Sequence, residues 1–549
     1  MANESVDGVS RPEKSHAEVR VEVTPRSRKT EAISKKPLSQ QPSRSASNAI
    51  REGLHNGRFF WTLEFIPSQD KILYDELHKL GGIAGAMSED SLLAGFAVAD
   101  RVVSDWDPDP AEAATHLLGV SGKQPLVHFS GKGREASHLH EFLSRMRENG
   151  LENVLILSGD RLKEEPKDRR PRYLESVPAI QLAKQFDPDL FVAAALNPFK
   201  YREEDAMAQY LKLGKKVGAG VDCIITQVGF DMLKYEEAVY WTGREGYRLP
   251  IIANVLAMSA KRARYIRTHQ LPGVTITDSF IALLEEEEQM LADQGAARVL
   301  RRLALQILGV QYFGYMGVQI SGLHSVKKVA ALQTLVQELS EQCPDRLTWK
   351  KAWDESLTFA EGGRVNPVST RNPWYLMSPH PSRASLQERV KYKVMSRVHS
   401  FLFDKGFGAR LLGPLMRPVK RHSTADRIFE RIEHAIKSPL FGCETCGMCR
   451  LAATQYVCPE TCPKGLANGA CGGTTNNLCE FGDRECVHSV KYRIAKDAGV
   501  LHELETWQVA AIPQGTRHTC SWPSHFRGEG PEIRVIDFLH PKRNQLRNG

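Results

Sequence analysis

The chain has 549 residues, of which 42% are hydrophobic and 25% are charged, and its formal net charge at pH 7 is +8. A chain of this length exceeds the roughly 100–250 residues that one core supports, so we expect at least two folded domains. Because the charge is mild and no apolar run approaches the roughly 20 residues that cross a bilayer, we expect neither nucleic acid nor a membrane as a partner.

Residues 1–55 are expected to form a disordered basic tail. They are rich in Ser, Pro, Lys, Arg and Glu and nearly free of aromatic side chains. Such a composition buries too little apolar surface to offset the entropy lost on ordering. The stretch also lacks the apolar core of a secretory signal, so we expect a cytoplasmic protein with reduced thiols.

Residues 56–340 alternate short apolar runs with helical patterns, and the longest helical pattern extends from Leu283 to Leu308. Continuous apolar strands separated by helices indicate a parallel sheet that is buried on both faces. Eight such runs favour a (β/α)8 TIM-like barrel over an open doubly wound sheet, whose first turn should be glycine-rich. The runs are 59–66, 91–98, 125–130, 153–160, 190–197, 223–230, 250–256 and 313–320.

Polar side chains lie at or near the ends of several predicted strands, where a barrel builds its active site. They are Glu64, His128, Asp160, Asn197 and Gln227. Glu64 is a carboxylate within the apolar run FFWTLEFIP, and burial there should raise its pKa towards that of a general acid. The alternative for Glu64 is a structural ion pair with Lys or Arg inside the barrel. For His128 and Gln227 the alternative is ordinary polar capping of strand ends.

Several motifs in this region occur in an order that resembles the methylenetetrahydrofolate reductases. The first-strand motif is T-L-E-F-I-P at 62–67, and the third-strand motif is V-H-F at 127–129. The segment G-L-E-N-V-L-I-L-S-G-D at 150–160 resembles the flavin-binding fourth strand of that family. K-V-G-A-G at 216–220, followed by I-T-Q at 225–227 and F-D at 230–231, completes the resemblance, which covers about residues 57–330.

The resemblance implies a flavin-dependent oxidoreductase, with FAD or FMN, that interconverts 5,10-methylenetetrahydrofolate and 5-methyltetrahydrofolate. Tetrahydrofolate would be the substrate, NAD(P)H or a redox protein the electron donor, and a homo-oligomer is an open alternative to a monomer. Glu64 would be the general acid, and Asp160 and Gln227 would orient the pterin. The resemblance assigns flavin contacts to His128, Leu157, Ser158, Gly159, Asp160, Asn197 and Lys216.

Two motifs depart from the family pattern. The family's L-R-G-D reads Leu157-Ser158-Gly159-Asp160 here, so an arginine is missing from the flavin-binding turn. The family's Y-P-E-x-H is replaced by A-L-N-P-F at 195–199. The flavin's identity therefore stays open between FAD, FMN and a flavin-free role.

Residues 341–385 read as a linker, residues 386–530 as a mostly helical cysteine-rich metal-binding domain, and residues 531–549 as a C-terminal tail. Helices are expected at 386–403, at 424–437 and at 488–505. Eight of the chain's eleven cysteines lie in this domain: Cys443, Cys446, Cys449, Cys458, Cys462, Cys471, Cys479 and Cys486.

The spacing C-x2-C-x2-C with a later Cys-Pro is typical of a [4Fe–4S] loop, whereas zinc needs only four tetrahedral ligands. We favour at least one [4Fe–4S] cluster, but zinc stays open. Eight cysteines suffice for two four-ligand sites, the second with Cys471, Cys479, Cys486 and His488 as candidates.

The cysteine pattern resembles the domain that accompanies some bacterial methylenetetrahydrofolate reductases. The matching segments are C-E-T-C-G-M-C-R-L, C-P-E-T-C-P-K and N-G-A-C-G-G. The resemblance implies a fused domain for electron entry or partner docking. The alternative is a non-catalytic folate-binding accessory protein with a structural zinc domain.

Overall fold

The computed structural model describes residues 48–68, 73–87, 92–102, 104–162, 173–269, 271–368, 370–377, 382–404 and 406–536. Most of the predicted N-terminal tail, residues 1–47, and the last residues of the predicted C-terminal tail, 537–549, lie outside these ranges. None of the described helices is long and apolar enough to cross a membrane.

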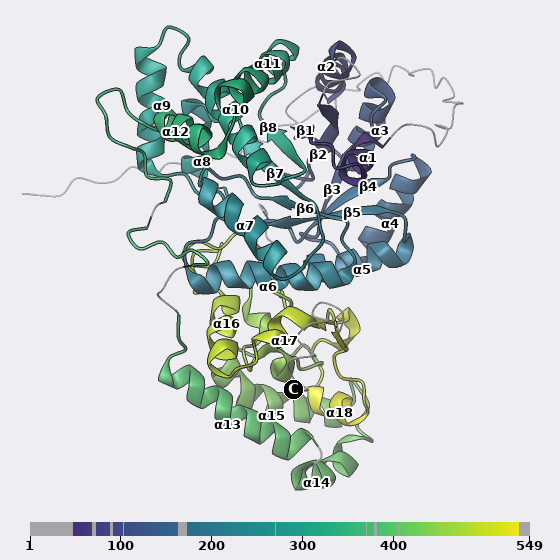
Figure 1. Cartoon of the computed structure of the whole chain (residues 1–549). Helices are drawn as coiled ribbons and strands as arrows, with labels where there is room; N and C mark the ends of the chain where they lie inside the picture. The colour runs from purple at the N-terminus through teal and green to yellow at the C-terminus, as the bar shows by residue number, and fades with distance from the viewer. Residues whose placement is uncertain are drawn as a thin grey trace, which may run out of the picture. The chain divides into compact units, whose positions relative to one another are not determined.

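Eight parallel strands close into a barrel in chain order, which confirms the predicted (β/α)8 TIM-like fold and excludes the open sheet (Figure 1). Each strand falls within or next to one of the eight predicted apolar runs. The strands are β1 (Phe60–Phe65), β2 (Leu93–Val98), β3 (Leu126–Ser130), β4 (Asn153–Leu157), β5 (Phe191–Leu196), β6 (Cys223–Thr226), β7 (Ile251–Leu256) and β8 (Gly317–Ser321).

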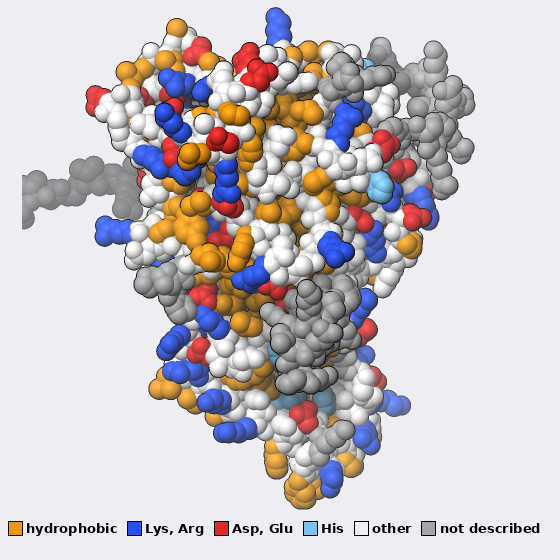
Figure 2. Space-filling model, in the orientation of Figure 1, with side chains coloured by type: hydrophobic (Ala, Val, Ile, Leu, Met, Phe, Trp, Pro, Cys, Tyr) orange, Lys and Arg blue, Asp and Glu red, His pale blue; other side chains and the backbone are white. Residues whose placement is uncertain are grey.

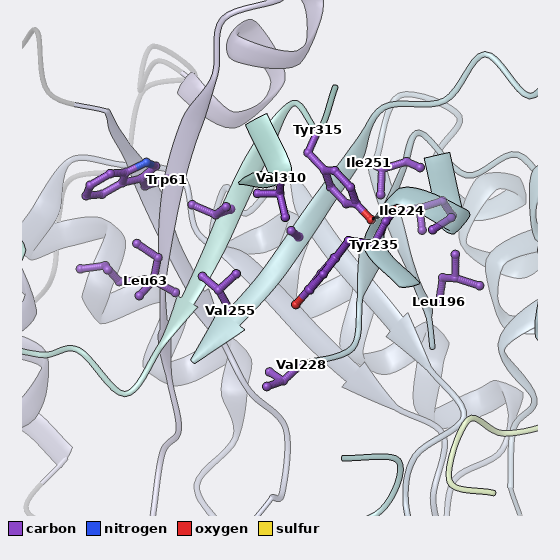
Figure 3. Packing of buried hydrophobic residues seen from close by; sticks show 14 of the residues in the cluster. Trp61, Leu63, Leu196, Ile224, Val228, Tyr235, Ile251, Val255, Val310 and Tyr315 are labelled. Carbon is purple, nitrogen blue, oxygen red and sulfur yellow. Dashed lines mark hydrogen bonds between the residues drawn. The ribbon is translucent and has the colours of Figure 1, made fainter. Parts of the chain in front are cut away.

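Helices surround the barrel, and the main core lies between them and the strands. Figure 3 shows part of this core, including Trp61 and Leu63 of β1. The helices are α2 (Leu73–Ala86), α3 (Pro110–Ser121), α4 (Ala136–Glu148), α5 (Ser176–Phe186), α6 (Glu203–Ala219), α7 (Met232–Arg244), α8 (Ala260–His269), α9 (Asp278–Met290), α10 (Ala296–Tyr312), α11 (Val326–Gln342) and α12 (Arg346–Ser356).

A short helix, α1 (Ala49–His55), corrects the predicted tail at its C-terminal end. The side chain of Asn48 caps it by accepting a hydrogen bond from Arg51 N, and also bonds Asn153 at the start of β4. Ile50 is 1% exposed and belongs to the apolar cluster inside the barrel. Ile50 and the partly buried Leu54 are the only large apolar residues of this helix, and both pack against the barrel cluster. The composition of the segment alone therefore resembles that of a tail.

Two further predictions are wrong in detail. The helical run from Leu283 to Leu308 is two helices, because Gln294 and Gly295 adopt left-handed backbone conformations between α9 and α10. The first part of the predicted linker is α12, in which the indole of Trp349 donates a 2.7 Å hydrogen bond to Leu305 O of α10. Residues 341–356 therefore belong to the outer layer of the barrel.

The cysteine-rich domain is mostly helical, as predicted. The predicted helix at 488–505 is broken, since Gly499 has a φ of +72°. The predicted C-terminal tail begins with a strand that pairs antiparallel with β9. The elements are α13 (Leu386–Phe403), α14 (Phe407–Met416), α15 (Thr424–Phe441), α16 (Val487–Asp497), α17 (Leu501–Thr506), β9 (Trp507–Val509), α18 (Ser521–Phe526) and β10 (Ile533–Val535), with 3-10 turns at Leu451–Thr454, Pro459–Thr461 and Gln514–Thr516.

Helix α6 of the barrel carries much of the contact with the cysteine-rich domain, through α16 and α17 (Figure 1). Tyr492 of α16 donates a 2.6 Å hydrogen bond to Glu203, at the start of α6. Glu175, just before α5, accepts hydrogen bonds from the backbone of Ala467 and Asn468 at 3.1 and 2.9 Å. Buried, charge-assisted hydrogen bonds of this kind fix orientation as well as proximity.

Candidate active site

A cavity of about 210 Å³ opens at the carboxyl ends of the barrel strands. All nine barrel residues that the sequence singles out line it, although they come from five strands and a helix. They are Glu64, His128, Leu157, Ser158, Gly159, Asp160, Asn197, Lys216 and Gln227. The fold therefore gathers the predicted catalytic and flavin-binding residues around one space.

Glu64 points into the barrel because side chains alternate along β1. Phe60 belongs to the inner cluster and Leu63 to the outer one, so Glu64 shares the inner face with Phe60. Its carboxylate accepts hydrogen bonds from the Ser321 hydroxyl and, at 3.3 Å, from the Gln319 amide. Within the described residues it forms no ion pair, which disfavours the structural alternative.

Burial raises the pKa of the Glu64 carboxyl above its ordinary value of 4.5, and the hydrogen bond from Ser321 only partly opposes this rise. Burial acts in this direction because a carboxylate loses more solvation than the neutral acid does. A carboxyl of this kind carries a proton at higher pH than an exposed one, which is what a general acid requires.

Several buried polar atoms on the cavity wall have no hydrogen-bond partner among the described residues. They are His128 Nε2, Ser130 Oγ, Gln209 Nε2 and Gln319 Oε1. Burial lowers the pKa of His128 to about 4, so its imidazole is neutral near pH 7. Because buried polar groups are almost always paired in folded proteins, these atoms fit a polar ligand in the cavity.

The turn after β4 lies tightly against the turn after β3. Gly159 has a φ of +84°, and a Cβ atom there would lie 2.2 Å from Ser130 Oγ, so only glycine fits. Ser158 is buried, and its hydroxyl accepts a 3.1 Å hydrogen bond from Ser176 N at the start of α5. Asp160 lies exposed at the rim of the cavity.

A lysine from the cysteine-rich domain stands beside the turn that lacks the family's arginine. Lys464 Nζ donates a 2.7 Å hydrogen bond to Gly159 O and forms an ion pair with Glu480. Both side chains of the pair are almost fully buried, at 2% and 4% exposure. A cation thus reaches the flavin-type turn from a segment about 300 residues away.

The remaining predicted residues are held by backbone contacts. Lys216 donates to Ala195 O, and burial lowers its pKa to about 7. The amide of Asn197 donates to Gly273 O at 2.9 Å and to Gly472 O at 2.8 Å, so both its hydrogens are used. Asn197 therefore connects the barrel to the cysteine-rich domain, while the Gln227 side chain accepts a 2.9 Å bond from Val228 N.

Residues 470–473 of the cysteine-rich domain form part of the cavity wall. Lys200 donates to Gly472 O at 2.7 Å, and Lys212 donates to Ala470 O at 3.2 Å. Nothing in the sequence indicated that this loop enters the site, since its glycines read only as part of the cysteine pattern.

Ser321, Gln319 and Asn254 were also missed as site residues. Ser321 Oγ lies 3.1 Å from Asn254 Oδ1 while it donates to Glu64, so the last two strands fix the carboxyl. The sequence G-V-Q-I-S at 317–321 could have indicated two of them. Gln319 and Ser321 are two positions apart, and alternate side chains of a strand lie on the same face, so both polar side chains point into the barrel.

The eight clustered cysteines divide into two groups of four, each lining its own small cavity. The first group is Cys443, Cys446, Cys449 and Cys458. The second group is Cys462, Cys471, Cys479 and Cys486, with His488 on the same wall. Cys462 thus joins the second group, where the sequence suggested a set without it. None of the eight forms a disulfide in the described part of the chain.

The second group touches the barrel, because Cys471 lines its own cavity and the cavity at the barrel mouth. The first group lies among α13, α15 and the turns that follow α15. Among the described residues, no three His, Cys, Asp or Glu side chains converge closely enough to hold a single metal ion.

Comparisons with known proteins match the barrel and the cysteine-rich domain separately. Residues 49–316 match the family model "Methylenetetrahydrofolate reductase", and residues 422–512 match "Methylene-tetrahydrofolate reductase C terminal". The chain is 22% identical over 237 residues to Methylenetetrahydrofolate reductase (NADH) 1 of Arabidopsis thaliana, covering 38% of this chain and 37% of that protein. The chain therefore spans little more than a third of that relative's length.

Two solved structures are similar at 13% and 10% identity. One, an uncharacterized protein from Clostridium thermocellum that binds two copies of 5-methyl-5,6,7,8-tetrahydrofolic acid, covers 54% of this chain and 99% of its own, with a TM-score of 0.41. The other, 2,3-dimethylmalate lyase, covers 55% and 88%, with a TM-score of 0.31. On its two matched segments, the chain belongs to the methylenetetrahydrofolate reductase family, with a barrel of that family followed by the family's C-terminal domain.

Proposed function

We propose that the barrel interconverts 5,10-methylenetetrahydrofolate and 5-methyltetrahydrofolate with the help of a bound flavin. The observation that carries the proposal is Glu64, a carboxyl of raised pKa held at the barrel mouth without an ion-pair partner in the described part of the chain. The family membership of the barrel supports the folate substrate.

Glu64 would donate a proton to the folate nitrogen, and the Ser321 hydroxyl would hold the carboxyl in place for this transfer. Gln227 and Asp160, on the same wall, would orient the pterin. A flavin, when bound, supplies the hydride exchange with the one-carbon unit.

The residues of the mouth fit a flavin in their chemistry. The unpaired Nε2 of neutral His128 can bond a polar ring edge, and Lys216 lies on the same wall. A nearby anion such as a phosphate would favour the charged form of Lys216, opposing the effect of burial on its pKa. Lys464, which is paired with Glu480 and bonds Gly159 O, would hold in place the turn in which the family pattern has an arginine.

The size of the cavity sets a condition on binding. Its volume of about 210 Å³ is below the roughly 300–1,000 Å³ of usual ligand pockets. Flavin and folate together would need more room than this volume, and displacement of the loop at 470–473, which forms part of the wall, is one way to provide it. Substrate entry would then be coupled to the position of the cysteine-rich domain.

We further propose that each cysteine group holds a [4Fe–4S] cluster and that the domain carries electrons between the barrel and NAD(P)H or a redox protein in the cytoplasm. The spacing C-x2-C-x2-C is typical of a [4Fe–4S] loop, and four cysteines line each of the two cavities, as a cluster with four thiolate ligands requires. Lys200 and Lys464, close to the second group, favour the negative charge that thiolate ligands bring.

The test is Glu64→Gln, with Glu152→Gln as the matched control. Glu152 is a carboxylate at the opposite end of the barrel, bonded to Asn48. Glu64→Gln should reduce folate turnover by about 10²–10⁴-fold, since general acid catalysis is worth that much, while chemical reduction of the flavin continues. Glu152→Gln should leave both rates unchanged.

An equal loss of both half-reactions in Glu64→Gln would contradict the proposal, because it would make Glu64 a structural residue. The small cavity and the use of the Asn197 amide by Gly472 favour a second candidate, a folate-binding accessory protein. A colourless protein that contains zinc and binds 5-methyltetrahydrofolate without oxidising it would support that candidate.

A further inference from the structure

Three helices of the cysteine-rich domain expose rows of large apolar side chains. On α13 the row has a four-residue spacing, and α14 and α15 repeat it. A residue every four positions lies on one face of a helix, so each row is a continuous stripe. The exposed residues are Leu386, Val390, Val394, Val398 and Phe401 on α13, Phe407, Leu411 and Leu415 on α14, and Ile428, Ile432, Ile436 and Leu440 on α15.

These stripes belong to neighbouring helices. Helix α13 contacts α14, and Lys391 of α13 bonds Leu440 O and lies 4.6 Å from the ring of Phe441, at the end of α15. Figure 2 shows hydrophobic side chains gathered with basic ones at the lower end, where Figure 1 draws α13 and α14. We call these twelve residues the apolar face. Exposed apolar side chains that gather on a soluble protein mark interaction sites.

The charge around the apolar face is strongly positive. Residues 386–441 contain twelve Lys and Arg against five Asp and Glu, an excess of seven in a chain whose formal charge is +8. Two of the five acids, Asp426 and Glu433, are buried, at 1% and 5% exposure. Eight basic residues are exposed: Arg389, Lys393, Arg397, Arg410, Arg417, Lys420, Arg427 and Arg431.

The apolar face lies directly behind the first cysteine group. Tyr392 and Met395, on the opposite side of α13, pack in the same cluster as Cys449 and Cys458. A partner seated on α13 would therefore be separated from these sulfurs by about one helix diameter, roughly 10–12 Å. Cys443 follows the end of α15 after a single glycine, so a second helix of the face also leads to the group.

We propose that the apolar face is the docking surface for a small acidic iron–sulfur electron-carrier protein. This rests on the proposed function of the cysteine groups. One electron would leave the reduced carrier and enter the centre held by the first group, with no proton or atom transferred. Complementary charge would steer the encounter, and the apolar stripes would provide the contact area of a transient redox complex.

Charge argues against a second copy of this chain as the occupant. A two-fold interface would place the same patch on both sides, so two faces with an excess of seven positive charges each would meet. Like charges opposed across an interface cost several kcal/mol. The acidic partner is the occupant that this face complements.

The test uses the anaerobically purified full chain and a purified acidic [2Fe–2S] ferredoxin as the probe. Binding is measured by calorimetric titration at low and high salt, and the rate at which the reduced probe reduces the chain is measured by stopped flow. The variants are Arg397→Glu with Arg431→Glu, and Val394→Glu with Ile436→Glu. The matched controls are Arg267→Glu and Leu347→Glu, on exposed barrel surfaces at 61% and 79% exposure.

Both double variants should weaken binding and slow reduction by the probe about tenfold or more, and added salt should weaken binding to the parent chain. The controls should behave like the parent, and dithionite should reduce all proteins equally. Binding that ignores salt and both variants would overturn the proposal. So would binding only to vesicles with phosphatidylserine, or a dimer of the chain that the variants dissociate.

The two measurements separate this proposal from the proposed function. Salt-sensitive binding to the face without electron transfer would support the docking surface while contradicting a redox role for the first group. Electron transfer from dithionite to the centres, with no binding of the probe at the face, would support the redox role of the cysteine groups and contradict the docking surface.

Discussion

The amino and carboxyl ends of the barrel strands differ in how many buried polar side-chain atoms lack a partner among the described residues: Gln124 Oε1, just before β3, is one at the amino ends, whereas four line the cavity at the carboxyl ends. At the amino ends, α1 closes the barrel, Ile50 fills an apolar cluster, and the amides of Asn48 and Asn153 bond each other at 2.8 and 3.2 Å. At the carboxyl ends, His128 Nε2 and Gln319 Oε1 are buried without a partner in the described part of the chain.

The difference separates stability from function within one barrel. An unpaired buried polar atom costs free energy, so a cluster of them persists where a ligand completes the hydrogen bonds. In barrels of this kind the carboxyl ends hold the active site and the amino ends contribute to stability. Substitutions at the carboxyl ends should therefore alter activity, and substitutions at the amino ends should alter stability.

The largest effect on stability is expected where the cysteine-rich domain meets the mouth. Lys464→Met would leave Glu480 charged and buried without its partner. We expect the free energy of unfolding to fall by about 3–5 kcal/mol, measured by chemical denaturation of the anaerobic protein. Lys350→Met, in an exposed pair with Asp354, is the control and should cost less than about 1 kcal/mol. Similar losses in both variants would mean that the buried Lys464–Glu480 pair contributes no more to stability than an exposed pair does.

At the amino end, Ile50→Ala should lower the free energy of unfolding by about 2–5 kcal/mol, because it leaves a cavity in the apolar cluster. Folate affinity and turnover should stay unchanged in the folded fraction, since Ile50 lies at the far end of the barrel. Met290→Ala, 68% exposed, is the control and should change stability by less than about 0.5 kcal/mol. A loss of turnover with intact stability would contradict the separation of the two ends.

The smallest effect concerns pH. Ser321 donates to the Glu64 carboxylate and so opposes the rise of its pKa. Ser321→Ala should raise that pKa further, so the turnover that needs protonated Glu64 should persist to higher pH than in the parent. At low pH the two proteins should differ by less than about tenfold. Ser321→Thr keeps the hydroxyl and should retain the pH profile of the parent. If Ser321→Ala leaves the pH profile unshifted, Ser321 does not influence the pKa of Glu64.

The same pKa fixes the sign of a stability change. Because the folded state holds the Glu64 proton at higher pH than the unfolded chain does, the contribution of Glu64 to stability falls as pH rises above about 4.5. The parent should therefore lose this contribution between pH 4.5 and the raised pKa, and Glu64→Gln should not.

Much of the barrel could be predicted from sequence because its signals are local. The eight apolar runs predicted the eight strands. The polar residues predicted at strand ends, such as Glu64 and His128, line one cavity. The Gln319 and Ser321 positions carried the same signal in β8. These predictions succeed because side-chain parity and strand ends are properties of short segments.

Long-range contacts could not be read in this way. Lys464 and Gly159 are separated by 305 positions, and nothing near either residue indicates their hydrogen bond. The division of the eight cysteines also depends on chain path, since Cys458 and Cys462 are close in sequence yet line different cavities. Helix α1 was missed because its stability comes from the barrel rather than from its own pattern.

The most direct test of the central claim is an anaerobic titration of the full chain with 5-methyltetrahydrofolate, followed by visible absorbance. A flavin bound at the mouth should show its bands in the purified protein, and these should bleach as the folate is oxidised. Protein that binds the folate yet carries no flavin after gentle purification, or whose flavin bands stay unchanged, would contradict the account.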